Sequence, residues 1–99
     1  MEDEKTEFDL AAEQIVAMGN RMLDADEEAD SWEVASGLLA GAIQFWLYSR
    51  QPCDNAFCED CADIGTAELR IRKLIEEARE HAEGSDYYQS PHDLNVGSA

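Results

Sequence analysis

The chain has 99 residues, of which 44% are hydrophobic, so it is long enough for one small domain with a modest core. Twenty-three acidic against seven basic residues give a net charge of −16, which argues against binding to nucleic acid or anionic membranes because their phosphates repel carboxylates. The N-terminus is acidic where a secretory signal is basic, and the longest apolar stretch, 34–48, is shorter than the roughly 20 residues that span a bilayer, so we expect a soluble, cytoplasmic protein.

Residues 6–23 carry the first helical pattern. Thr6 is a suitable N-cap, and Asp9 lies near the positive end of the helix dipole. The apolar residues recur at intervals of three and four and form one stripe: Phe8, Ala11, Ala12, Ile15, Val16, Gly19, Met22 and Leu23. This spacing predicts an amphipathic helix with one face toward a core.

A dense acidic run follows the first helix and contains Asp24, Asp26, Glu27, Glu28, Asp30 and Glu33. Such a run is usually a solvated loop that caps its neighbouring helices. Carboxylates spaced along helices can also imitate the phosphates of a duplex, so these six residues are the candidate surface for docking on a basic protein. Trp32 lies inside the run, where it is either a binding hot spot or, as we favour, an anchor of the core.

Residues 31–49 predict a second helix that is apolar on most sides, with Asp30 as its cap. A helix of this kind is buried on most sides, so we expect it to be central. Gly37 and Gly41 are four residues apart and share a face on which a neighbouring helix could approach closely. Because two other helices cannot cover it completely, either the C-terminal tail packs over it or two chains pair through it, and we favour the homodimer.

The loop at 51–62 contains Cys53, Cys58 and Cys61 in a C-x4-C-x2-C pattern. Thiolates this close in sequence can share a metal ion, and zinc takes four ligands. We name His81 as the fourth ligand. The other residues that could supply it are His92, Asp54 and Asp60.

Three other interpretations of the loop remain open. The spacing matches the first three ligands of plant-type iron–sulfur loops, but the fourth cysteine is missing. The thiols could also stay reduced, or Cys53 could form a disulfide with Cys58 or Cys61. A redox-active Cys58-x-x-Cys61 pair is disfavoured, because the neighbouring carboxylates oppose thiolate formation.

Residues 64–83 predict the third helix, capped by Asp63 or Thr66 and ended by Gly84. His81 lies in its last turn, where an imidazolium is more often a partner of the helix dipole than a metal ligand. The tail, 85–99, has the composition of a flexible segment, and four of its residues could dock it: Tyr87, Tyr88, Leu94 and Val96.

These patterns predict an all-α protein. We expect a small three-helix bundle over residues 1–84, with a cysteine-containing interhelical loop, and a tail over 85–99. No catalytic constellation is recognisable, so we expect a non-enzymatic protein. The leading hypothesis is an acidic protein that docks on a basic surface, such as a nucleic-acid mimic that inhibits a DNA- or RNA-binding protein in the manner of phage inhibitors of host defence. The alternatives are a zinc-binding helical module built on the cysteine loop, and an accessory subunit of a larger assembly.

Overall fold

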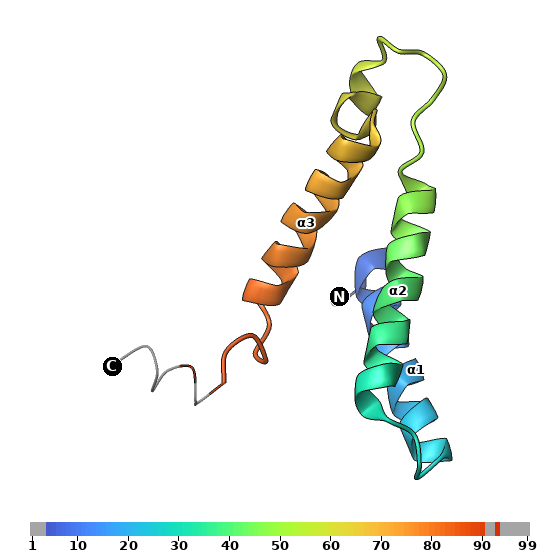
Figure 1. The fold of residues 1–99 in the computed structure, drawn as a ribbon, viewed down its shortest axis with the longest axis vertical. Helices are drawn as coiled ribbons and strands as arrows, with labels where there is room; N and C mark the ends of the chain where they lie inside the picture. Colours follow the sequence, from blue (N-terminus) through green and yellow to red (C-terminus); the bar gives the residue numbers. More distant parts are fainter. Residues whose placement is uncertain (1–3, 91–92, 94–99) are drawn as a thin grey trace. The chain divides into compact units, whose positions relative to one another are not determined.

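The computed structural model describes residues 4–90 and 93, and these residues contain helices and no strand (Figure 1). The elements are α1 (Glu7–Ala25), α2 (Ser31–Ser49), the short 3₁₀ helix η1 (Glu59–Ile64) and α3 (Ala67–Glu83). The predicted all-α class is therefore confirmed. None of the helices in the described residues is both long and apolar enough to cross a membrane. The chain divides into two compact units, residues 1–49 and 50–99, and each is described here by itself.

The N-terminal unit is a pair of helices whose starts are set by side-chain caps. Thr6 Oγ1 accepts a hydrogen bond from the Asp9 N–H at 3.1 Å, and Asp9 Oδ2 accepts one from the Thr6 N–H at 3.2 Å. This reciprocal capping box confirms Thr6 as the cap of α1. Asp30 Oδ1 accepts a hydrogen bond from the Trp32 N–H at 3.0 Å, as expected for a residue that begins α2.

Helices α1 and α2 lie side by side (Figure 1). They pack tightly at Gly19, where a Cβ atom would lie only 3.0 Å from Cδ1 of Leu38. The half-buried side chains of the pair are apolar residues from both helices, among them Ile15, Leu23, Leu38 and Trp46. The glycine in α1 therefore lets a leucine of α2 pack against the helix backbone.

The expectation that α2 is a buried, central helix is wrong for the single chain. No residue of α2 is buried, and Trp32, Leu39 and Phe45 are 84%, 60% and 71% exposed. No atom of the described residues lies within 4 Å of the position that a Cβ atom would take at Gly37 or Gly41, so helix α1 does not approach α2 there. The apolar pattern predicts that another surface covers this face of α2, but it does not identify that surface. Homodimer formation through α2 stays a prediction.

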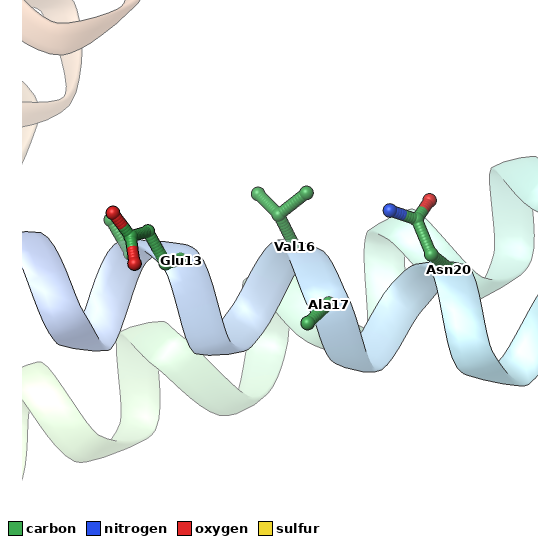
Figure 2. A pocket seen from close by; sticks show the side chains of 5 residues that line it. Glu13, Val16, Ala17 and Asn20 are labelled. Carbon is green, nitrogen blue, oxygen red and sulfur yellow. The ribbon is translucent and has the colours of Figure 1, made fainter.

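The outer side of α1 has a shallow depression around Val16. Glu13, Val16 and Asn20 project from this side of the helix (Figure 2). The depression is open, and its lining is completed by Ala12 and Ala17. Its lining comes from α1 alone and does not enclose a ligand, so it is not a candidate binding site.

The C-terminal unit is built on α3, with η1 packed against it. Thr66 Oγ1 accepts a hydrogen bond from the Leu69 N–H at 3.1 Å, so Thr66 rather than Asp63 is the cap of α3. The guanidinium of Arg70 donates a hydrogen bond to the carbonyl of Ile64 at 3.1 Å, which attaches the end of η1 to the first turn of α3. Gly84 ends α3, as predicted.

The first residues after α3 form turns with exposed side chains. Tyr87 is 94% exposed and Tyr88 is 54% exposed, so neither tyrosine docks the tail in this structure. Leu94 and Val96, the other two expected docking residues, lie outside the described residues.

Candidate metal centre

The three cysteines come from two segments that the loop folds together. Cys53 lies in the extended stretch after α2, Cys58 is the residue before η1, and Cys61 lies within η1. Asn55 makes the turn between them: its Oδ1 accepts a hydrogen bond from the Phe57 N–H at 2.9 Å, and its carbonyl accepts one from the Cys58 N–H at 3.1 Å. This Asx turn reverses the chain so that Cys58 and Cys61 face Cys53.

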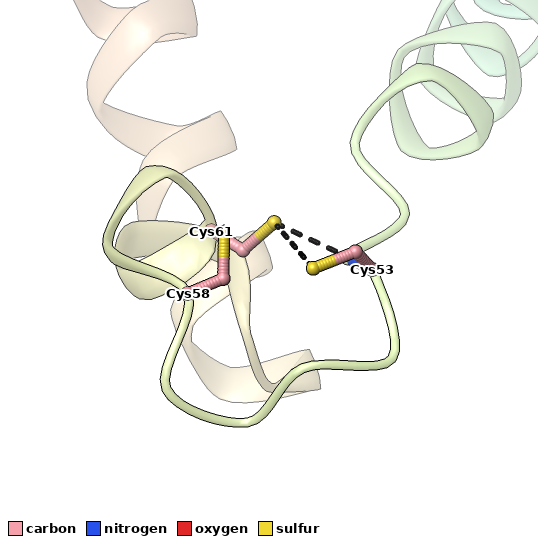
Figure 3. A group of neighbouring side chains, drawn as sticks. All are labelled: Cys53, Cys58 and Cys61. Atoms are coloured by element: carbon pink, nitrogen blue, oxygen red, sulfur yellow. Dashed lines mark hydrogen bonds between the residues drawn. The ribbon is translucent and has the colours of Figure 1, made fainter.

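The three sulfur atoms converge on one point (Figure 3). They lie 3.7-3.8 Å from one another, and Cys53 Sγ and Cys61 Sγ are 3.8 Å apart. A disulfide requires an S–S distance of about 2.05 Å, so the thiols are not bonded, and all three cysteines are free. Metal–sulfur bonds of about 2.3 Å in a regular tetrahedron place the sulfurs about 3.8 Å apart. The three sulfurs therefore match one face of a tetrahedral thiolate site.

The local hydrogen bonds give the thiols unequal acidity. The backbone N–H of Cys61 is the main cause that lowers the pKa of Cys58, and the thiols of Cys53 and Cys61 contribute to the same shift. The backbone N–H of Cys53, which points at Cys61 Sγ from 3.4 Å, acts to lower the pKa of Cys61. The adjacent thiols of Cys58 and Cys53, with desolvation, outweigh it and raise that pKa. Cys58 is therefore the thiol that ionises first. Ionisation of Cys61 is less favourable, because it would place a second negative charge beside the first.

A half-open cleft of about 360 Å³ lies over the three sulfurs. Its walls are mostly small or apolar, and they come from the loop, from η1 and from the start of α3. The lining residues besides the cysteines are Pro52, Asn55, Ala56, Ala62, Gly65, Thr66 and Leu69. A bound ion would therefore remain accessible from one side.

His81, the predicted fourth ligand, does not join the cluster. It lies in the last turn of α3, and its Nε2 is 4.0 Å from Glu77 Oε2. His81 follows Ala67 by 14 residues, which is about 21 Å of helix at 1.5 Å per residue, whereas the cysteines lie at the opposite end of α3. Among the described residues, the group that can share an ion consists of the three cysteines, without Asp54 or Asp60. His92 lies outside the described residues.

The acidic run, the predicted docking surface, is solvent-exposed at all six positions: Asp24, Asp26, Glu27, Glu28, Asp30 and Glu33. Two of these carboxylates have local structural roles. Asp26 Oδ1 accepts a hydrogen bond from the Glu28 N–H at 2.9 Å, and Asp30 Oδ1 accepts the bond that begins α2. The run therefore shapes the turn between α1 and α2, and docking on a basic protein stays a prediction.

Comparison with known proteins identifies no relative of this chain. No protein-family model matches the sequence, no curated protein matches it significantly, and no solved structure matches its fold significantly.

Proposed function

We propose that this protein is a zinc-binding helical module in which Cys53, Cys58 and Cys61 are the metal ligands. The observation that carries the proposal is the spacing of the three sulfurs, 3.7-3.8 Å, which is the edge of a tetrahedron around a zinc ion with bonds of about 2.3 Å.

The charges around the cluster favour a cation. The segment 51–64 contains no basic residue and four carboxylates, Asp54, Glu59, Asp60 and Asp63, of which Asp63 is paired with Lys73 at 4.0 Å. Three thiolates at this spacing also repel one another, and a dication removes that repulsion. In the metal-free chain the neighbouring thiols raise the pKa of Cys61, so this thiol keeps its proton when no cation compensates the negative charge.

The small core of the C-terminal unit also supports a metal. None of the described residues of either unit is buried, and Leu69 and Leu74 of α3 are only half-buried. Small domains with little buried surface are usually stabilised by disulfides, a metal or association. Zinc would link the extended segment at Cys53 to η1 and so to the start of α3.

The choice of metal follows from the ligand type. Thiolates are soft ligands that select zinc and copper(I) over magnesium or calcium. A plant-type iron–sulfur cluster takes four cysteines, and the chain has three. Zinc is therefore the ion to test first, with copper(I) as the competitor.

The test is metal content and affinity of the full chain purified with its thiols reduced. The expected result is one zinc per chain, lost when Cys58 is replaced by serine. Ala78→Ser is the matched control, because it places the same hydroxyl on an exposed position of α3 outside the cleft. A wild-type chain that binds no zinc, or a Cys58→Ser variant that binds it as tightly, would overturn the proposal.

A further inference from the structure

We infer that the fourth coordination position of this site is filled by a neutral nitrogen donor, the imidazole of a histidine on a separate docking protein, that enters through the cleft. The inference rests on the proposed zinc site. The three sulfurs would occupy three corners of the zinc tetrahedron, and the inference concerns the fourth. With an outside ligand at that corner, the zinc ion would bind a partner as well as stabilise the loop.

The described residues provide three corners of the tetrahedron and a cleft over the fourth. Within this part of the chain, no carboxylate or imidazole joins the three sulfurs at a common distance. The cleft has two polar side chains besides the cysteines, Asn55 and Thr66, and each is already used in a local backbone bond. Asn55 Oδ1 accepts the Phe57 N–H, and Thr66 Oγ1 accepts the Leu69 N–H.

The walls of the cleft allow a flat ring to reach the ion. Three of its lining residues are alanine or glycine, namely Ala56, Ala62 and Gly65, and the volume is about 360 Å³. Gly65 lies over the carbonyl of Cys61, where a Cβ atom would be 3.4 Å from the oxygen. Closed structural zinc sites have four protein ligands, whereas sites with three keep one position for an outside ligand.

The charge of the site selects a neutral donor. Zinc with three thiolates carries one net negative charge, and four carboxylates lie in the same short segment. A thiolate or carboxylate in the fourth position would add a further negative charge to this surrounding, whereas water and an imidazole nitrogen add none. Of these two neutral donors, imidazole is the one that a protein partner supplies to zinc. The histidine of a docking protein has this chemistry, and free imidazole reproduces it.

The test uses the full chain loaded with Co²⁺, whose visible absorption depends on the geometry and ligands of a tetrahedral site. The thiolate charge-transfer band reports whether the three cysteines remain bound, and the d–d bands report the fourth ligand. The protein is titrated with imidazole, with 2-mercaptoethanol and with azide. We expect imidazole to shift the d–d bands in a saturable manner with the charge-transfer band retained, and the two anionic donors to act only at much higher concentration.

Two variants make the inference falsifiable. Ala56→Leu fills the cleft and should weaken imidazole binding at least tenfold while cobalt stays bound, whereas Ala78→Leu, outside the cleft, should change nothing. A spectrum that ignores imidazole in the wild type but responds in a His92→Ala variant would identify this chain's own histidine as the fourth ligand and overturn the inference. Stronger binding of the thiol than of imidazole would overturn the choice of a neutral donor. Absence of cobalt binding altogether would instead overturn the proposed zinc site.

Discussion

Replacing Cys58 with serine should abolish the stabilisation of the protein by zinc. Cys58 is the thiol with the lowered pKa, because the backbone N–H of Cys61 stabilises its thiolate, so it is the first ligand to ionise. Serine keeps the size of the side chain, but its hydroxyl does not ionise near neutral pH. The metal-free proteins should therefore have nearly equal stability, and the difference should appear only when zinc is added.

The magnitude follows from linkage. A ligand that binds the folded state alone, at a free concentration of 100 times its Kd, stabilises that state by about 2.7 kcal/mol. In a domain of roughly 60–100 residues, 1 kcal/mol shifts Tm by about 4–8 °C, so zinc should raise the Tm of the wild type by about 10–20 °C. With so little buried surface to stabilise the metal-free chain, this increment should be a large part of the total.

The assay is thermal unfolding of the full chain, followed by circular dichroism at the helix band, with zinc and with a chelator. Ala78→Ser, the control variant, should keep the full zinc-dependent shift. An equal rise in Tm for the wild type and for Cys58→Ser would refute the reasoning, because zinc would then act at some other part of the protein. No rise in either protein would show that the three thiols do not bind zinc under these conditions.

Three further predictions concern pH, glycine and charge. Zinc affinity should fall as the pH falls, because the raised pKa of Cys61 means that this thiol must lose a proton to bind. The expected fall is about tenfold per pH unit for each proton displaced. A zinc affinity that calorimetry finds to be independent of pH would contradict this prediction. Gly37→Ala and Gly41→Ala should each raise the free energy of unfolding in urea by about 0.5–1 kcal/mol, since no described atom lies near either position. Gly19→Ala should raise the free energy of unfolding by less, because the Leu38 side chain must move. A loss at Gly37 or Gly41 would mean that another helix covers α2 in solution. Replacing Glu27 and Glu28 by lysine leaves the capping carboxylates of Asp26 and Asp30 in place. If the acidic run is a docking surface, the immobilised variant should no longer retain basic proteins from a lysate at low salt. Unchanged retention would count against that role.

The ends of the helices could be predicted from the sequence because local chemistry decides them. Thr6 and Gly84 occupy the expected cap positions. For the start of α3 the sequence allows Asp63 or Thr66 as the cap, and the cap is Thr66. Gly65 is a poor helix residue, and the Thr66 side chain accepts the bond that Leu69 needs, so residues 59–64 form a separate 3₁₀ helix.

The convergence of the candidate ligands could be predicted only where these residues are close in sequence. The three cysteines lie within nine residues, so their convergence required one turn, which Asn55 supplies. His81 is one of two histidines in the chain, but its place in the last turn of α3 separates it from the cysteines near the helix start. The exposure of α2 could not be foreseen either, because an apolar face predicts that something covers it without identifying what does.

The short spacing of the three thiols has a kinetic consequence for folding. The loop from Cys53 to Cys61 is nine residues long, and a loop of about ten residues closes in roughly 10–100 ns. The entropy lost on closing so short a loop is small, so the thiols can meet, and capture an ion, before α3 has packed against η1. The ion would then act as a nucleus from which the first turn of α3 grows, and metal supply during synthesis would determine how quickly this half of the chain becomes ordered.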